Sequence, residues 1–284
     1  MITGGTGFVG RELVKQLRAH NHKITIYSRN ELPIRMGITT VTGKLDDAAS
    51  LDHAMNGVDT VIHLAAVISP KNPAEFQTIN VECTQHILDA CTRNKISRFI
   101  FMSSYVADPI FETPYGISKH RAEERVRGTT LNWTILRPTL IYGKDTNPLT
   151  QLITLVRKYP IVPAIYGILQ PISVADVADA VIKTISAPKS FKHTYTLAGD
   201  EPISTATLCK RIAHTLGLKR IILRLPPFFS RIMLRPATIV SPGLATSITH
   251  LLNARPLSTE GAFHDFGWKP QPFAPQFEAM LKQN

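Results

Sequence analysis

The 284-residue chain has few cysteines and no long apolar run. Its three cysteines, Cys83, Cys91 and Cys209, are scattered and make no CxxC pair, which excludes a disulfide framework and a zinc ribbon and predicts a reducing, cytoplasmic setting. No apolar segment approaches the roughly 18 residues that a membrane-spanning helix needs. With 44% hydrophobic and 19% charged residues, the composition predicts a globular protein with a full core.

Acidic residues are also scarce, and the scarcity is local. The formal net charge is +11, and residues 202–259 contain eight Lys or Arg and no Asp or Glu. No nucleic-acid-reading motif accompanies this excess, so a nucleic-acid partner is not expected. The charge predicts a C-terminal lobe that meets something anionic, either a phosphorylated ligand or a lipid surface.

Residues 218–236 carry much of this charge among apolar residues. After two prolines, Phe229, Ile232 and Met233 would share one face of a helix and two arginines another. The favoured interpretation is a solvated basic face of the second lobe. The alternatives are a pocket for an apolar substrate and peripheral contact with an anionic membrane.

The first half of the chain alternates short β-rich runs with helical patterns, which is typical of a parallel sheet covered by helices on both faces. Strands are expected at 1–3, 23–28, 38–42, 60–64, 98–102 and 134–137, and helices at 8–20 and 72–94, the latter opened by Asn72 as N-cap. After Gly143 the alternation loosens. Further helices are expected from Asn147-Pro148 and at 174–185, 205–216 and 275–282. The pattern predicts a doubly wound α/β domain over 1–145, to which 174–187 return, and a smaller mixed lobe from 146–173 and 188–284.

A glycine-rich turn, Thr3-Gly4-Gly5-Thr6-Gly7-Phe8-Val9-Gly10, joins the first strand to the first helix. In this context Gly4 can make the tight turn, Gly7 lets the backbone approach a pyrophosphate, and Gly10 lets the helix pack close to the strand. The free N–H groups of the helix N-terminus would face the phosphates. The turn predicts a dinucleotide site.

The end of the second strand bears on which dinucleotide is bound. An acidic residue there would bind the ribose 2′-OH of NAD, whereas an arginine suits the 2′-phosphate of NADP. This strand is followed by Arg29, so NADP is favoured, and nearby Glu31 keeps NAD as the alternative.

Further motifs follow in order along the chain, and with them the sequence resembles the extended short-chain dehydrogenase/reductase family, the NAD-dependent epimerase/dehydratase group. They are Gly43-Lys44-Leu45-Asp46, His63-Leu64-Ala65-Ala66, Asn80-Val81 with Thr84, Ser103-Ser104, Tyr115-Gly116-Ile117-Ser118-Lys119 and Arg137-Pro138. The resemblance implies a Rossmann fold and a nicotinamide cofactor. It also implies a cofactor site formed by Gly4, Thr6, Gly7, Phe8, Val9, Arg29, Lys44, Leu45, Leu64, Ala65, Ala66, Asn80, Ser103, Tyr115, Lys119 and Pro138.

The same resemblance implies a catalytic set of three residues. Tyr115 would be the acid/base, Lys119 the ribose anchor that lowers the pKa of the tyrosine, and Ser104 the residue that orients the substrate oxygen. The spacing agrees, because residues four apart share a helix face. The expected activity is hydride transfer to or from a carbonyl or alcohol substrate. The rival interpretation is a non-catalytic NADP-binding accessory subunit or sensor of a membrane complex. Residues 218–236, with Pro171-Ile172-Ser173-Val174, resemble the branch of the family that contains the NADPH-binding accessory subunit of respiratory complex I and sterol-type or lipid-type dehydrogenases, so the substrate would be a nucleotide sugar, a sterol or a lipid-like compound.

Three departures from the family pattern qualify these expectations. Lys44 replaces the usual acidic residue, which again favours NADP. The segment between Ser104 and Tyr115 is shorter than in most nucleotide-sugar members, which weighs against such a substrate. Only two residues precede the glycine turn, so we expect the natural chain to begin further upstream. The family's habit of dimerising through helices beside the sheet implies a homodimer.

Overall fold

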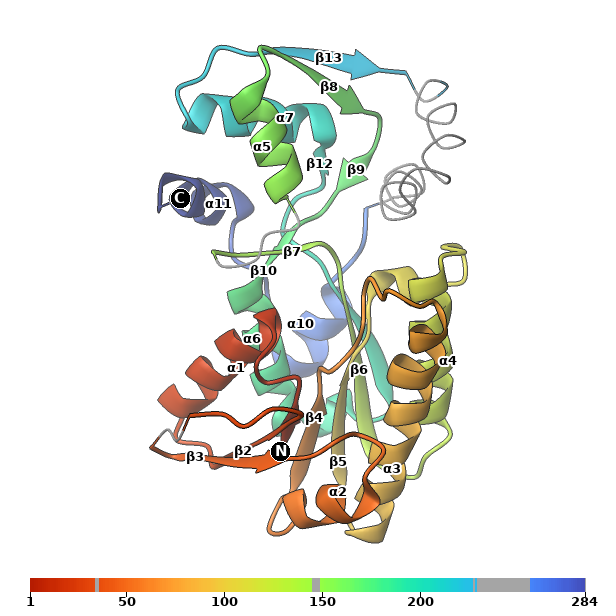
Figure 1. Ribbon diagram of the computed structural model, residues 1–284. Helices are drawn as coiled ribbons and strands as arrows, with labels where there is room; N and C mark the ends of the chain where they lie inside the picture. The colour runs from red at the N-terminus through yellow and green to blue at the C-terminus, as the bar shows by residue number, and fades with distance from the viewer. Residues whose placement is uncertain (34–35, 145–148, 227, 229–255, 284) are drawn as a thin grey trace. The chain divides into compact units, whose positions relative to one another are not determined.

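The computed structural model describes residues 1–33, 36–144, 149–226, 228 and 256–283 (Figure 1). Two compact units divide the chain. Unit 1 comprises Met1–Pro138, Val174–Leu197 and Thr259–Lys269, and unit 2 comprises Thr139–Ser173, Ala198–Ser258 and Pro270–Asn284.

Unit 1 is built on a seven-stranded sheet in which every neighbouring pair is parallel. Its strands are β1 (Ile2–Thr3), β2 (Ile24–Ser28), β3 (Ile38–Thr42), β4 (Thr60–His63), β5 (Arg98–Met102), β6 (Asn132–Pro138) and β11 (His193–Leu197). Their order is β11-β6-β5-β4-β1-β2-β3. The chain order reverses direction beside β1, as in a doubly wound sheet, and the predicted fold class is confirmed.

Helices cover this sheet because each presents an apolar face to it. They are α1 (Phe8–Ala19), α2 (Ala48–Ala54), the π-helix η1 (Phe76–Glu82), α3 (Cys83–Arg93), α4 (Pro114–Arg127), α6 (Val174–Ile185) and α10 (Glu260–Phe266), with short 3₁₀ turns η2 (Tyr105–Ala107) and η3 (Pro188–Ser190). In Figure 1, α1 and α6 pack together beside one face, and α3 and α4 lie beside the other. The side chains of β5 are buried along the whole strand, as expected for a strand covered on both faces.

The helix predicted over 72–94 has the expected extent but a different middle. The Asn72 side chain accepts a hydrogen bond from the N–H of Ala74, as its predicted role as N-cap requires. From Phe76 to Glu82 the chain then widens into a π-helix before continuing as α3. Such segments are rare and are frequently found at functional sites, and apolar periodicity cannot distinguish them from an α-helix.

The expected boundary between the lobes also differs from the structure. The sequence predicts residues 188–284 in the second lobe, whereas Pro188–Leu197 and Thr259–Lys269 belong to unit 1. It also predicts that the first domain extends to residue 145, whereas unit 2 begins at Thr139. Strand β11 belongs to unit 1 because it pairs with β6 at the edge of the sheet. The pairing is parallel and runs from His193 opposite Thr134 to Leu197 opposite Pro138.

In the residues that the structure describes, unit 2 contains three two-stranded sheets and three helices around a separate core. The strands pair as β7 (Ile141–Tyr142) with β10 (Ile172–Ser173), β8 (Ile161–Ile165) with β13 (Ile221–Leu225), and β9 (Ile168–Leu169) with β12 (Ile203–Ser204). The helices are α5 (Thr150–Lys158), α7 (Thr205–Thr215) and α11 (Phe273–Gln283). Phe273 and Phe277 stack in this core, and Tyr142 meets both edge-on.

Candidate cofactor and catalytic site

The glycine turn of unit 1 folds as its sequence predicts. Gly4 has a φ of +72°, and a Cβ there would lie 2.7 Å from the backbone nitrogen of Ala65. A Cβ on Gly10 would overlap the carbonyl oxygen of Gly4, so α1 packs against the turn only because position 10 lacks a side chain. Helix α1 begins after Gly7 with no side-chain cap and no acidic residue in its first turn. Its N-terminal N–H groups therefore suit a phosphate.

Two exposed cations lie at the carboxyl ends of neighbouring strands. Arg29 follows Ser28 at the end of β2, and Lys44 follows β3, whose Thr42 pairs with Ser28. The Tyr27 hydroxyl donates a hydrogen bond of 2.7 Å to the Lys44 carbonyl and also contacts the Ser50 hydroxyl. These contacts hold the segment of Lys44 and the partly buried Leu45 against the start of α2.

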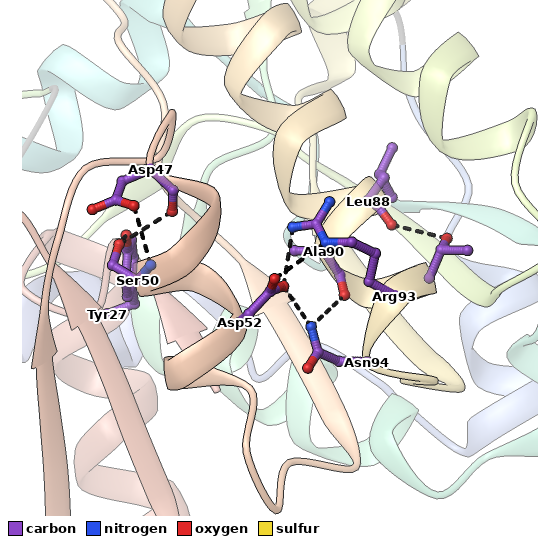
Figure 2. Close-up of polar contacts among 9 residues, drawn as sticks. Tyr27, Asp47, Ser50, Asp52, Leu88, Ala90, Arg93 and Asn94 are labelled. Carbon is purple, nitrogen blue, oxygen red and sulfur yellow. Dashed lines mark hydrogen bonds and ion pairs between the residues drawn. The ribbon is translucent and has the colours of Figure 1, made fainter.

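The start of α2 is itself well fixed (Figure 2). Asp47 caps the helix by accepting a hydrogen bond from the N–H of Ser50, and the Ser50 hydroxyl donates back to the Asp47 carbonyl. On the same helix, Asp52 binds Arg93 and Asn94 at the end of α3. The Lys44 backbone is therefore held directly by Tyr27 and leads into the anchored helix α2, although the Lys44 ammonium is exposed.

A directed chain of hydrogen bonds runs from β1 through His63 to η1. The Thr84 hydroxyl donates its one proton to the Asn80 carbonyl, so it accepts from Nε2–H of His63, 3.0 Å away. Nδ1 of His63 then accepts from the Thr3 hydroxyl at 2.6 Å. Burial, with the charge of Lys119, lowers the pKa of His63 to about 3. The imidazole is thus held neutral and in one tautomer.

Asn80 holds the loop after β4. Its side-chain oxygen accepts from the N–H of Val67 and its side-chain nitrogen donates to the Val67 carbonyl, at 2.8 and 3.0 Å. The same nitrogen donates to the Ser118 hydroxyl on α4. The backbone of Leu64–Ala66 lies between these contacts and the glycine turn, where Leu64 N–H donates to the Thr3 carbonyl. Asn80 thus links this loop to α4.

The catalytic pair predicted from the sequence lies on α4. Thr113 caps this helix by accepting from the N–H of Gly116, and Pro114 occupies its first turn. Gly116 has no room for a Cβ, which would overlap the Val106 carbonyl of η2. This contact brings Tyr115 next to the segment that begins with Ser104.

The Tyr115 phenol shares a hydrogen bond with Ser104. Burial raises the pKa of Tyr115 to about 12, and the hydrogen bond from Ser104 offsets this only in part. The expectation that a neighbouring lysine would lower the pKa of this tyrosine is therefore not met by the groups that the chain itself supplies. The phenol holds its proton at neutral pH.

Lys119 lies one turn along the same helix and is 1% exposed. Its ammonium lies 4.1 Å from the centre of the Phe101 ring. Burial lowers the pKa of Lys119 to about 7, and the negative charge of Glu123 opposes that shift. The same ammonium is close enough to His63 to act on its pKa, so Lys119 lies beside the end of β4.

One buried acidic residue of this region was missed by sequence reasoning. Glu123 is fully buried, one turn beyond Lys119, and accepts from Ser103 and Arg137. The sequence does contain a signal for it, which is an acidic residue on the helix face that carries the predicted catalytic pair. Residues 115, 119 and 123 recur at intervals of four and share that face of α4.

Every residue expected in the cofactor and catalytic sets belongs to unit 1. Ser104, Tyr115 and Lys119 come together around the end of β5 and the first two turns of α4, and Pro138 ends β6 opposite Leu197. Arg29 and Lys44 lie at the ends of β2 and β3, with Thr6, Gly7, Phe8 and Val9 at the start of α1.

The helix expected after residue 228 of the basic stretch lies outside the described residues, and the described part contains the strand β13.

Between residues 1 and 283, apart from the undescribed segments, no helix combines the length and apolarity needed to cross a bilayer. Within the same residues, no cluster of His, Cys, Asp and Glu suits a metal ion.

Comparison with known proteins places this geometry in context. The chain is 27% identical over 233 residues to ceramide reductase of Caulobacter vibrioides, which covers 79% of this chain and 73% of that protein. It is 25% identical over 233 residues to the 40 kDa subunit of mitochondrial NADH-ubiquinone oxidoreductase of Neurospora crassa, covering 79% of this chain and 62% of that subunit.

Solved structures share the fold. The enzyme WbmG of Bordetella bronchiseptica in complex with NAD superposes with a TM-score of 0.80 at 17% identity, covering 99% of this chain and 92% of that one. A family model described as NAD(P)H-binding matches residues 4–188, which contain the glycine turn, Ser104, Tyr115 and Lys119. The chain therefore belongs to the NAD(P)H-binding family.

Proposed function

We propose that the protein is an NAD(P)-dependent enzyme of the short-chain dehydrogenase/reductase type, which transfers hydride between nicotinamide and a carbonyl or alcohol substrate. The observation that carries this proposal is the Tyr115 phenol, protonated and hydrogen-bonded to Ser104, with the Lys119 ammonium one turn away. A cofactor site that only stabilised the fold would have no use for a proton donor beside a cationic residue.

The residues of unit 1 fit a dinucleotide. The turn at Gly4, Gly7 and Gly10 has no room for Cβ atoms at positions 4 and 10 and leaves the N-terminus of α1 open to a pyrophosphate. Leu64–Ala66, Lys119 and Pro138 would line the path from there to the nicotinamide. When bound, the nicotinamide supplies or accepts the hydride.

The chain's own residues then provide the proton. Ser104 binds the substrate oxygen and holds it against Tyr115. Because the pKa of Tyr115 is about 12, the phenol is a proton donor at neutral pH. As the substrate carbon gains the hydride, the phenol O–H bond breaks and a bond forms between that proton and the substrate oxygen. Lys119, one turn along α4, would anchor the nicotinamide ribose. The groups on the chain thus favour reduction of a carbonyl.

For the cofactor, we infer a preference for NADP over NAD. Arg29 and Lys44 supply two exposed positive charges at the ends of paired strands, which suits a 2′-phosphate. Glu31 also follows β2, so NAD is the alternative.

For the substrate, an apolar or anionic carbonyl compound is favoured. Relatives include ceramide reductase and a sterol-4-alpha-carboxylate 3-dehydrogenase of Dictyostelium discoideum, and also UDP-glucose 4-epimerase of Vibrio cholerae. The short segment between Ser104 and Tyr115, which holds only the turn η2, weighs against a nucleotide sugar. Peripheral membrane contact through 218–236 and a homodimer stay predictions.

Replacing Tyr115 tests the proposed function. We expect Tyr115→Phe to lower turnover at least ~100-fold while the Kd for NADPH changes less than about twofold, because only the proton donor is lost. The measurement is NADPH oxidation with a panel of long-chain and sterol-like ketones. Tyr159→Phe, at an exposed tyrosine of unit 2, is the control and should leave turnover unchanged. Full turnover in Tyr115→Phe would exclude this mechanism.

A non-catalytic accessory subunit is the second candidate, favoured by the likeness to the 40 kDa subunit of NADH-ubiquinone oxidoreductase. In that case NADPH would bind and stabilise unit 1 without turnover. Stoichiometric purification with a membrane complex, together with no hydride exchange on any carbonyl compound, would favour this candidate.

A further inference from the structure

Glu123 is the centre of a buried ionic cluster beneath the proposed catalytic residues. One carboxylate oxygen accepts from the Ser103 hydroxyl at 2.6 Å and from Nε of Arg137 at 2.8 Å. The other accepts from Arg137 at 2.6 Å and from Arg127 at 2.5 Å. Four donors thus satisfy one carboxylate whose side chain is 0% exposed, while those of Arg137 and Arg127 are 17% and 35% exposed.

The three elements joined by this carboxylate each carry a residue of the proposed site. Ser103 directly follows β5 and immediately precedes Ser104. Glu123 lies on α4, two turns from Tyr115 and one from Lys119. Arg137 lies on β6 and immediately precedes Pro138. A paired Arg–carboxylate fork fixes orientation as well as distance.

We propose that Glu123 is a positioning residue of the hydride-transfer reaction, which locks Ser104, α4 and Pro138 in one register and favours the protonated form of Lys119, one turn away on the same face of α4. The inference rests on the proposed function. Nothing in the fold alone requires an acid here, since a buried ion pair is often no more stabilising than apolar side chains of the same shape. A carboxylate one turn from the proposed catalytic lysine, on the same face of α4, does have a use in catalysis.

The electrostatic part of the proposal depends on the groups that surround Lys119. Glu123 and Tyr115 lie one turn to either side of it on its own helix, His63 lies near it on β4, and its ammonium lies over the Phe101 ring of β5. His63 and Tyr115 are neutral near pH 7, which leaves Glu123 as the negative charge that acts on Lys119. The positive charges of Arg127 and Arg137 oppose it from beyond the carboxylate.

Two single substitutions should move the protonation of Lys119 in opposite directions. The measurement is the Kd for NADPH between pH 5.5 and 9, followed by the cofactor's own fluorescence, together with the pH profile of turnover. In Glu123→Gln the pH midpoint at which NADPH binding weakens should fall by about one unit, because the protonation equilibrium of Lys119 changes about tenfold. At acid pH, where Lys119 is protonated again, the Kd should recover towards the wild-type value. In Arg127→Gln the midpoint should rise.

Controls separate positioning from stability. Glu124→Gln, at the adjacent 63% exposed residue, should leave the midpoint in place. Glu123→Asp keeps the charge and shortens the reach, so it should keep the midpoint while turnover falls severalfold. Arg127→Gln covers the case in which Glu123→Gln fails to fold, because Arg127 is partly exposed and Glu123 retains its bonds to Ser103 and Arg137.

The outcomes distinguish this inference from the proposed function. An unmoved midpoint in Glu123→Gln, or in Arg127→Gln if the former does not fold, with activity reduced equally at every pH, would overturn the positioning role while hydride transfer stands. Absence of hydride transfer in the wild-type protein would overturn the proposed function, and the binding profiles would still show whether Glu123 controls Lys119.

Discussion

At the scale of single residues, burial outweighs neighbouring charge around the proposed site. It raises the pKa of Tyr115, lowers that of Lys119 and lowers that of His63. Glu123 is the exception, because hydrogen bonds from Arg137 and Ser103 more than offset its burial and hold its pKa below the usual value. The one stable charge in this group is thus the carboxylate with four donors.

Arg29 allows a test of cofactor preference by a single exposed side chain. We expect Arg29→Ser to raise the Kd for NADPH about tenfold and to leave that for NADH within about twofold, since a charge-assisted hydrogen bond to phosphate contributes about 1.5–3 kcal/mol. Titration of each cofactor by fluorescence measures both constants. Lys23→Ser, an exposed cation at the opposite end of the same strand, should change neither. Equal losses for both cofactors would contradict the assignment.

At the scale of elements, the turn from β1 into α1 is set by the absence of side chains. The backbone of Gly4 and Gly5 occupies the space that a Cβ on Gly10 would need. The free energy that holds α1 on the sheet, through its buried Leu13, Val14 and Leu17, therefore depends on one missing methyl group.

Gly10→Ala tests this close approach. We expect the free energy of unfolding to fall by about 1–3 kcal/mol, the usual cost of overpacking, and NADPH binding to weaken because the turn must shift. Chemical denaturation and cofactor titration check the two effects. Gly128→Ala is the matched control, because its Cβ would make only ordinary contact at 3.5 Å, and it should change stability by less than about 1 kcal/mol. Equal effects of the two substitutions would contradict the role of Gly10.

Most of these elements could be predicted from the sequence, because they depend on local patterns. The strand 98–102, the helix 174–185 and the glycine turn were all placed from periodicity and spacing. The π-helix could not be, since it shares its apolar spacing with an α-helix. Strand β11 was assigned to the wrong lobe because pairing with β6 is a long-range contact that five residues do not encode. The Glu123 cluster was missed for a related reason, because its donors come from three elements.

At the scale of the whole molecule, unit 1 is assembled from three separated stretches of chain. Both tryptophans of the chain belong to it, Trp133 on β6 and Trp268 after α10, and both are buried. The Trp268 ring donates to the Asp176 carbonyl on α6, which ties the last of these stretches to the second. Tryptophan fluorescence therefore reports the unfolding of unit 1 separately from unit 2.

His63 predicts how the stability of unit 1 depends on pH. Its pKa falls from 6.5 to about 3 on folding, so between these values the unfolded chain binds one proton more than the folded one. Stability is present above pH 6.5 and is lost as the pH falls, by about 1.4 kcal/mol per pH unit from this group. Urea unfolding between pH 4 and 6.5, followed by tryptophan fluorescence, should show this slope.

The comparison that isolates His63 is a difference between slopes. His63→Gln should reduce the pH slope of the unfolding free energy by the contribution of one proton, about 1.4 kcal/mol per pH unit, whatever its effect on absolute stability. His53→Gln, at an exposed histidine of α2, should leave the slope as it is. If both variants keep the wild-type slope, His63 is not held neutral in the folded protein.

The position of β11 has a consequence for the chain during its synthesis. When the ribosome has produced β6, the sheet has only six of its strands, and the outer side of β6 displays unpaired backbone groups until β11 is made. The intervening residues, roughly fifty, take about 3–10 seconds to translate. During that interval β6 is an edge strand with unpaired N–H and C=O groups, the arrangement most prone to intermolecular strand pairing.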